Sequence, residues 1–415
     1  MKKYLVISLL LAFPLVAPHA DLQPASIFSD RLILQREQPV AIWGTGTPGK
    51  TVEVRFAGQT VSAKVDQQGA WKAELKPMKA SDTGRELMLS DGTTEITLKN
   101  VVVGEVWLAA GQSNMQMNGR NMVKKLPEAA VAFEENGFPQ VRLLRINEPV
   151  AGGRRDDFTT APTWNAANPE SAKSFSAVAW VFGRRIHEEL KVPIGLIDVS
   201  WGGKPIEPFI PGEAYAGHPL LKQIKALADE KKLDELAQLT GGVIIRNPEG
   251  YPGAIYDARM RPIAGFGLRG FLWYQAESNC GKGEDPTDYR HKQRIMIESW
   301  RAAWSNPELP VYYVQLPNFR KEAINWVRMR EEQRLALKVP HTGMAVTIDT
   351  GSHDIHPANK IDVGQRLARF ALRRDYGKEM VDSGPVYQAH KIEDTIVHVT
   401  FSHAEGGLMI GKKTG

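Results

Sequence analysis

The sequence predicts an α/β protein in which helices cover both faces of a mostly parallel sheet, with a small β-sandwich before it and a β-segment after it. Two observations predict this architecture. Strand-like and helix-like runs alternate over residues 101–382, whereas residues 21–100 hold only short strands separated by turn residues. Strand-like runs return over residues 383–415. We therefore expect three structural units after an N-terminal leader.

The leader, residues 1–20, has the pattern of a secretory signal peptide. Lys2 and Lys3 give a positive start, and a short apolar run from Tyr4 to Ala17 follows. The run is too short to cross a bilayer comfortably, so an uncleaved anchor is the weaker interpretation. We expect cleavage after Ala20, a secreted or periplasmic protein, and no membrane association once the signal is removed.

Residues 21–100 predict the β-sandwich. Apolar and polar side chains alternate in short runs such as Val40–Trp43, Val52–Phe56 and Thr60–Val65, and glycine-containing turns such as Asp91-Gly92 separate them. Period-two alternation places the apolar side chains on one face of each strand. Several strands of this kind favour a small antiparallel sandwich, immunoglobulin-like in outline.

Residues 101–382 predict the parallel sheet. Apolar residues recur at helical spacing from Phe175 to Leu190, and the run Val192–Val199 follows as a buried strand. Open sheets of this kind bind ligands beyond the carboxyl ends of their strands. We therefore expect functional residues where the predicted strands end.

The first such strand end presents a serine. The run Glu105–Met115 carries a half-apolar strand into a tight turn at Ser113. A serine in this place exposes its hydroxyl, and the N–H groups at the start of a following helix point at whatever the hydroxyl attacks. Ser113 is therefore the candidate nucleophile. The alternative is an ordinary turn in which Ser113 or Asn114 caps a helix.

The candidate base and orienting acid lie together in a later loop. Among ten histidines, His356 lies two residues after Asp354 in a loop punctuated by glycine and proline. An imidazole can accept the serine proton, and a carboxylate on its other nitrogen fixes the tautomer. Ser113, His356 and Asp354 are thus a candidate triad. His353 is a rival base, although Pro357 holds the backbone of His356 extended or turned. A solvated surface loop is the alternative interpretation.

Two further strand ends offer hydrogen-bond donors. One predicted strand leads into Gly202 and Gly203, where the missing Cβ lets a backbone N–H approach a substrate oxygen. The next strand ends in Gln275, Glu277 and Asn279, whose amides can donate to an oxyanion and whose carboxylate can orient its neighbours. A simple positive-φ turn and an ordinary polar strand end are the alternatives.

Together these segments resemble the sialate O-acetylesterase family of carbohydrate esterases, a branch of the SGNH hydrolase superfamily. The resemblance covers nearly all of the mature chain, and it implies an SGNH-hydrolase-like three-layer α/β/α domain over residues 101–382. The matching blocks are Gly111-Gln-Ser-Asn-Met115, Trp201-Gly-Gly203, Trp273-Tyr-Gln-Ala-Glu-Ser-Asn279 and Asp354-Ile-His-Pro357.

The resemblance also implies roles for the residues in these blocks. Ser113 attacks an acetyl ester, His356 moves the proton, and Asp354 orients His356. The implied oxyanion donors are the Ser113 N–H, a glycine N–H at Gly202 or Gly203, and the Asn279 side chain. The remaining polar residues of the predicted oxyanion and substrate-binding set are Gln112, Gln275 and Glu277.

The implied activity is removal of O-acetyl groups from a sugar without a metal or an organic cofactor. The sequence leaves the sugar open: an O-acetylated sialic acid, an acetylated plant polysaccharide or peptidoglycan. Ala276 stands where the family usually has glycine, so the turn there either tolerates a methyl group or has shifted. A carbohydrate-binding protein that keeps the hydrolase fold without turnover is therefore the alternative from another class.

Composition narrows the possible partners, disulfides and metal sites. The net charge of +5 comes from basic residues interleaved with acidic ones, so we expect no nucleic-acid partner. The single cysteine, Cys280, excludes an internal disulfide and any multi-cysteine metal site. The sequence does not determine the oligomeric state. Because the resemblance implies that family members continue into a C-terminal β-segment, truncation at Gly415 also stays open.

Overall fold

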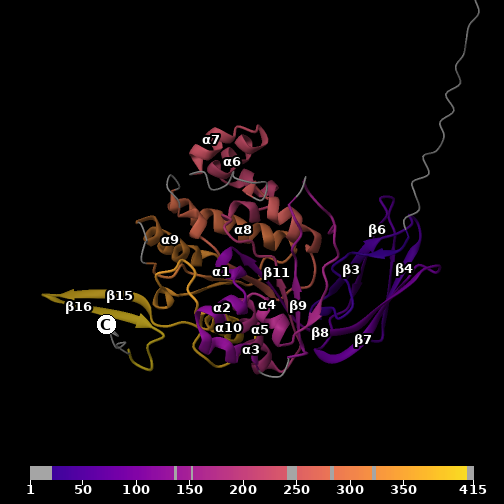
Figure 1. Ribbon diagram of the computed structural model, residues 1–415, viewed down its shortest axis with the longest axis horizontal. Helices are drawn as coiled ribbons and strands as arrows, with labels where there is room; N and C mark the ends of the chain where they lie inside the picture. Colours follow the sequence, from indigo (N-terminus) through magenta and orange to yellow (C-terminus); the bar gives the residue numbers. More distant parts are fainter. Residues whose placement is uncertain are drawn as a thin grey trace, which may run out of the picture.

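The computed structural model describes residues 21–134, 138–150, 153–240, 250–280, 285–319 and 324–408. It is a mixed α/β structure, as predicted (Figure 1). The N-terminal strands lie at one end of the molecule, a large sheet with its helices forms the body, and a β-hairpin projects at the other end (Figure 1). The predicted signal peptide, residues 1–20, lies outside the described residues.

The N-terminal part is built from short strands. They are β1 (Gln23–Pro24), β2 (Ile33–Gln35), β3 (Val40–Thr45), β4 (Thr51–Phe56), β5 (Gln59–Lys64), β6 (Ala70–Leu75) and β7 (Ser81–Ser90). β3 pairs with β1 and β6, whereas β4 pairs with β5 and β7, and all these pairs are antiparallel. Buried side chains from both groups, such as Ile42 and Val54, belong to one hydrophobic cluster. The alternation seen in the sequence therefore places these apolar side chains on the inner faces of the strands.

The central sheet is mostly parallel. Its order is β10 (Asn165–Ala166), β9 (Val141–Arg145), β11 (Ile194–Asp198), β8 (Glu95–Gly111), β12 (Gly270–Tyr274), β13 (Val311–Val314) and β14 (Thr342–Ala345). Neighbours from β9 to β14 run parallel, and only β10 is antiparallel to its neighbour on this path. Nearly all residues of β9, β11, β12, β13 and β14 are buried, and so are residues 101–111 of β8. Both faces of the sheet must therefore be covered.

Strand β8 shows how the two faces are covered. Trp107 and Ala109 belong to one hydrophobic cluster, whereas Leu108 and Ala110 belong to another. Side chains alternate between the faces of a strand, so the two clusters lie on opposite sides of the sheet. The first cluster includes residues of α5 (Ala177–Leu190) and α10 (Lys360–Arg374), and the second includes residues of α8 (Tyr289–Ala303).

The other helices are shorter or lie outside these two layers. They are α1 (Ser113–Gln116), α2 (Gly119–Lys125), α3 (Val131–Glu134), α4 (Pro169–Ser174), α6 (Pro219–Asp229), α7 (Leu233–Leu239) and α9 (Ile324–Leu335). Figure 1 shows α6 and α7 at the top, away from the sheet. In the part of the chain that the structure describes, no helix has both the length and the apolar character needed to span a membrane.

Strand β8 joins the N-terminal part to the central sheet. It pairs with β7 and then with β11 and β12, so the predicted boundary between residues 100 and 101 falls inside one strand. Near the crossing, buried Glu105 accepts hydrogen bonds from Arg269 at 2.8 and 3.0 Å, from Gln35 at 2.9 Å, and from Arg36. Although burial opposes it, the bonds and charge of Arg269 hold the pKa of Glu105 below its ordinary value.

Strand β14 ends the central sheet on one side, and arginines of α10 bind its outer edge. Arg374 donates to the Thr342 carbonyl at 2.7 Å, and Arg366 donates to the Val346 carbonyl at 2.6 Å. An edge strand otherwise presents unpaired backbone groups to other chains. Side chains thus bond backbone carbonyls that have no neighbouring strand on this path.

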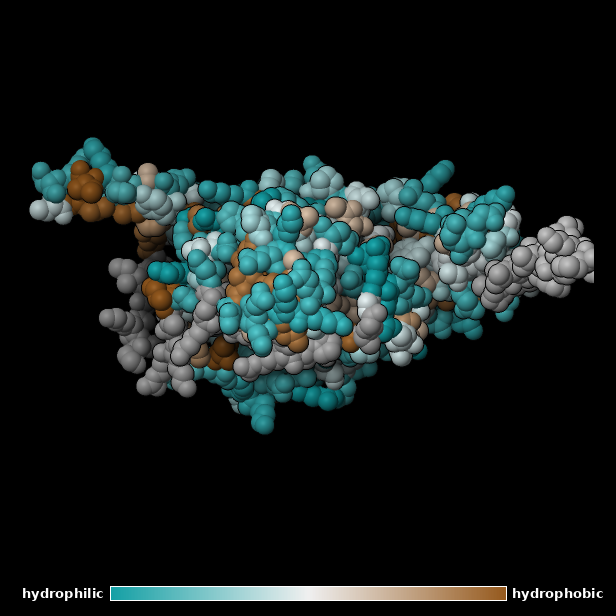
Figure 2. All heavy atoms as spheres, turned by 90° about the horizontal axis from the view of Figure 1, so that it is seen from above, coloured by the Kyte–Doolittle hydropathy of each residue, from teal (hydrophilic) through white to brown (hydrophobic). Residues whose placement is uncertain are grey.

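A projecting hairpin, β15 (Val386–Glu393) and β16 (Ile396–Ser402), follows the α/β part. Among the described strands, these two pair only with each other. Ile392 pairs with Val397 on one face, and both side chains are more than half exposed. Lys391 pairs with His398 on the other face. The hairpin therefore has an exposed apolar face, which is visible on the projecting arm in Figure 2.

Candidate active site

The chain turns sharply between the end of β8 and the start of α1. Gly111 has a φ of 139°, and a Cβ atom there would lie 2.1 Å from the Tyr274 carbonyl oxygen. Glycine alone suits this conformation and this contact. The Gln112 N–H donates to the same carbonyl at 3.0 Å. Ser113 is therefore held at the carboxyl edge of the sheet, beside the end of β12.

His356 reaches Ser113 from the loop that precedes α10. Its Nε2 lies 2.7 Å from the Ser113 Oγ. A serine hydroxyl donates only to an unprotonated ring nitrogen, so this contact fits a neutral imidazole with its proton on Nδ1. Burial lowers the pKa of His356 and favours that neutral form. His353, the rival base, is exposed, and no described contact joins it to Ser113.

Asp354 lies behind His356 but is shared with a lysine. Its Oδ1 is 3.6 Å from the His356 Nδ1 and accepts the His356 backbone N–H at 3.0 Å. Its Oδ2 pairs with Lys125, which also donates to the His356 carbonyl at 3.4 Å. The Lys125 hydrogen bond is the main reason that the pKa of Asp354 lies below its ordinary value. Asp354 is thus a carboxylate adjacent to the ring and not yet bonded to it.

Three predicted amide residues form a buried network behind the serine turn. Gln275 Nε2 donates to Gln112 Oε1 at 3.0 Å and to Asn279 Oδ1 at 2.9 Å. Gln112 Oε1 also accepts the Ser278 N–H at 3.1 Å. Asn279 Nδ2 donates to the buried Glu207 carboxylate at 3.1 Å. The structure brings the three amides together, and the described bonds join them to one another and to Glu207.

The predicted glycine pair lies beside the serine. A Cβ atom on Gly202 would be 3.6 Å from the Ser113 Cβ. The Gly202 N–H donates to Gln116 Oε1 at 3.0 Å. Gly203 has a φ of 71°, and no atom lies within 4 Å of the position where its Cβ would be. The two glycines therefore differ: a side chain of α1 binds the first N–H, and the second residue adjoins open space.

Glu277 belongs to a second buried group whose other members sequence reasoning missed. Asn114 Nδ2 donates to Glu277 Oε1, and Lys360 Nζ donates to Asn114 Oδ1 at 2.5 Å. Burial raises the pKa of Glu277 and lowers that of Lys360 to about 7. The sequence suggested Asn114 only as a helix cap. It gave no signal for Lys360, because lysine is normally exposed.

Ala276 lies at the end of β12, directly before Glu277. It is fully buried and has a φ of 146°, a conformation that strongly favours glycine. The turn has therefore kept a glycine-like backbone although the residue carries a methyl group. Backbone strain is located in the segment that positions Glu277 and Asn279.

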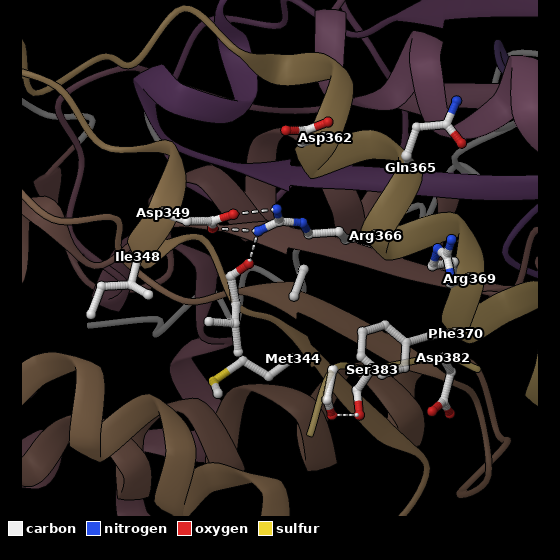
Figure 3. Close-up of a pocket in the computed structure, with 13 residues that line it drawn as sticks. Met344, Ile348, Asp349, Asp362, Gln365, Arg366, Arg369, Phe370, Asp382 and Ser383 are labelled. Carbon is white, nitrogen blue, oxygen red and sulfur yellow. Dashed lines mark hydrogen bonds and ion pairs between the residues drawn. The ribbon is translucent and has the colours of Figure 1, made fainter. Parts of the chain in front are cut away.

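A cavity of about 580 Å³ lies between the end of β14, α10 and the residues before the hairpin (Figure 3). Arg366 crosses it and forms a two-bond ion pair with Asp349, both bonds 2.6 Å long. None of the lining residues belongs to the predicted site. Asp349 precedes the loop that carries His356, so the ion pair braces the start of that loop. We assign the chemistry to the edge of the sheet at Ser113, where the predicted nucleophile and base meet.

A hydroxyl that is hydrogen-bonded to an imidazole at the carboxyl edge of a mostly parallel sheet suits acyl transfer. Comparison with known proteins agrees with this class of chemistry. Residues 103–373 match the family model described as carbohydrate esterase, sialic acid-specific acetylesterase. The chain therefore belongs to this family of carbohydrate esterases, and the resemblance predicted from the four sequence blocks is confirmed.

Individual relatives support the assignment. The chain is 30% identical to the sialate O-acetylesterase of Mus musculus, over 87% of this chain and 75% of the relative. The Homo sapiens sialate O-acetylesterase is also 30% identical, over 87% of this chain and 73% of the relative. A carbohydrate acetylesterase structure from Xanthomonas citri is 30% identical and superposes with a TM-score of 0.77, covering 91% of this chain and 81% of the other.

Lys125→Met is expected to move the acidic limb of the activity profile to higher pH. Burial is the main cause of the low pKa of His356, and the charge of Lys125 lowers it further. Removing that charge raises the pKa, so less neutral imidazole is present at a given acidic pH. The measurement is kcat/KM for p-nitrophenyl acetate against pH. Lys124→Met on the exposed side of the same helix is the control, and equal profiles for both variants would contradict the prediction.

Ala276→Gly is expected to leave the stability unchanged or to raise it. Glycine removes the strain at φ 146°, which offsets its larger entropy in the unfolded chain and the loss of one methyl group. The control is Ala179→Gly inside α5, which is expected to lower the free energy of unfolding by about 1 kcal/mol. Urea unfolding measures both. A loss at Ala276 as large as that at Ala179 would show that no strain is stored there.

Proposed function

We propose that this protein is an esterase that removes O-acetyl groups from sugars, with Ser113 as nucleophile and His356 as general base. The observation that carries the proposal is the 2.7 Å contact between the Ser113 Oγ and the His356 Nε2. Membership of a carbohydrate esterase family supports the reaction class. In this proposal Asp354 orients the imidazole and stabilises its protonated form.

The proposed reaction has two halves. The Ser113 Oγ attacks the acetyl carbonyl while His356 Nε2 takes the hydroxyl proton, and a tetrahedral intermediate forms. The bond to the sugar oxygen then breaks, His356 gives its proton to that oxygen, and the acetyl group stays on Ser113. Water attacks the acetyl-enzyme with His356 again acting as base, which releases acetate and restores Ser113.

In this proposal the backbone N–H groups of Ser113 and Gly203 are the first candidates for the oxyanion donors. The Ser113 N–H stands at the first position of α1, where an α-helix provides no acceptor, and the Gly203 N–H belongs to the residue beside open space. Gly202 and Asn279 donate to Gln116 and Glu207 in the described arrangement. For either of them to serve the oxyanion, its hydrogen bond would have to be exchanged or shared when substrate binds.

Asp354 requires only a small movement to complete the triad. Its Oδ1 is 3.6 Å from Nδ1 of His356, about half an ångström or more beyond a normal hydrogen bond. Catalytic hydrogen bonds are often long before substrate binds. A shift of about this size in the carboxylate or the imidazole would complete the hydrogen bond.

We propose an O-acetylated sialic acid as the substrate class, since two relatives are named sialate O-acetylesterase. Acetylated plant polysaccharide and peptidoglycan are the alternative esters. A non-catalytic carbohydrate-binding protein is the alternative from another class, and the strained Ala276 is the feature that favours it.

We also propose the finer architecture and the location that the sequence predicted. The α/β part would be an SGNH-type three-layer domain, and the N-terminal strands a β-sandwich whose inner faces supply the shared cluster. Residues 1–20 would direct the protein out of the cytoplasm to the periplasm or the medium.

Ser113→Ala is expected to lower kcat/KM for p-nitrophenyl acetate by about 10³-fold or more, because the nucleophile is lost while the fold is kept. Release of p-nitrophenol measures the rate. The control is Ser299→Ala in α8, a serine whose hydroxyl donates to the Met296 carbonyl, and it should retain wild-type activity. Equal rates for Ser113→Ala and the wild type would eliminate the proposed mechanism.

Acetate release is expected to be fastest from O-acetylated sialosides. The comparison set is acetylated xylan, xyloglucan and peptidoglycan at equal acetyl concentration, with Ser113→Ala as the blank for each. If acetate were released faster from one of the polymers, that polymer would become the proposed substrate class, and the proposed mechanism would stand. No release above the blank from any of the four would favour the non-catalytic alternative.

A further inference from the structure

The residue after the nucleophile ties the serine turn to the histidine loop. Asn114 follows Ser113 directly, and its Nδ2 donates to the Ile355 carbonyl at 3.0 Å. Ile355 directly precedes His356. One fully buried amide thus connects the immediate neighbours of two residues that are 243 positions apart in the chain. This connection joins the two segments that carry Ser113 and His356.

The direction of the Asn114 amide is set by its two other partners. In its ammonium form Lys360 can only donate, and its Nζ bonds Oδ1 at 2.5 Å, while the Glu277 carboxylate accepts from Nδ2. If the amide turned over, Oδ1 would face the Ile355 carbonyl and Nδ2 would face the ammonium group. Lys360 therefore selects the orientation in which Asn114 can hold the histidine loop.

Burying the Lys360 ammonium group costs folding free energy that an apolar side chain in the same place would not cost. Its side chain is fully buried at the first position of α10, 5.2 Å from the centre of the Tyr274 ring. Glu277 nearby keeps one buried oxygen that has no hydrogen-bond partner among the described residues. Burying charges that are only partly satisfied destabilises a fold, and apolar side chains of similar volume often replace them without loss.

We infer that Lys360 is a positioning residue for ester hydrolysis, acting through Asn114 to hold His356 at bonding distance from Ser113. The inference rests on the proposed function, because it assigns Lys360 a part in the Ser113 and His356 reaction. The described contacts of the Lys360 side chain are with Asn114 and the Tyr274 ring, and none of them joins it to the Ser113 Oγ or the His356 ring. Its contribution is geometric and should appear in the chemical step.

The test is Lys360→Met, which keeps the length of the side chain and removes its donor. The expected result with p-nitrophenyl acetate is a fall in kcat of about 10- to 100-fold with KM within about twofold, since small misplacement of catalytic groups slows chemistry. The control is Arg301→Met in α8, a buried cation that donates to the Leu309 and Pro340 carbonyls. It should lower the melting temperature and leave kcat unchanged.

A double-variant cycle separates positioning from general damage. If Lys360 acts through Asn114, the pair Lys360→Met and Asn114→Ala should be no slower than Asn114→Ala alone. Additive losses in the double variant, or a kcat for Lys360→Met within twofold of wild type, would overturn the inference. Measuring Ser113→Ala in parallel shows separately whether the esterase proposal itself fails.

If Lys360→Met does not fold, Asn114→Asp tests the step on which the role of Lys360 depends, the hydrogen bond from Asn114 to the histidine loop. An ionised aspartate keeps an oxygen for Lys360 and has no donor for the Ile355 carbonyl. The inference expects a comparable fall in kcat with KM retained. Wild-type kcat in a folded Asn114→Asp protein would overturn it.

Discussion

The contact between Gly111 and the Tyr274 carbonyl determines where the reactive hydroxyl lies. Strands β8 and β12 pair in parallel with Gly111 opposite Tyr274, and only the absence of a Cβ atom lets their ends approach so closely. The turn that carries Ser113 is thereby held in a fixed position beside the end of β12. The amide network and the bonds of Asn114 all start from residues within a few positions of this contact. The register between β8 and β12 therefore fixes the position of Ser113, and the other groups of the site are arranged around it.

Local sequence signals predicted the parts of the site that depend on local structure. A strand run that ends in glycine and polar residues identified the turns at Ser113, Gly202 and Asn279, because strand ends and positive-φ positions restrict which residues can occur. The α/β class followed from alternating helical and strand periods. The pairing of Ser113 with His356 was first proposed from the chemistry of a serine, a histidine and an aspartate, and the family blocks strengthened it, because no local rule joins residues so far apart in the chain.

Features that depend on packing between distant segments could not be predicted. Nothing near Lys360 indicates burial, since that follows from the packing of α10 against the serine turn. The hydrogen bond from the Asn279 amide to Glu207 was not predicted, because Glu207 comes from a separate segment. Lys125 on α2 likewise changes the electrostatics around Asp354 without any signal in the histidine loop. Hydrogen-bond direction is a three-dimensional property, and residue type alone leaves it open.

The arginines on the outer edge of β14 have a consequence for how molecules meet in solution. Every sheet that is not closed into a barrel presents two borders where a foreign strand could add. Here guanidinium groups bind the carbonyls of Thr342 and Val346, so an incoming strand would have to displace charged donors before it could pair. The addition of a strand from another molecule along this edge is therefore disfavoured by the loss of these two hydrogen bonds.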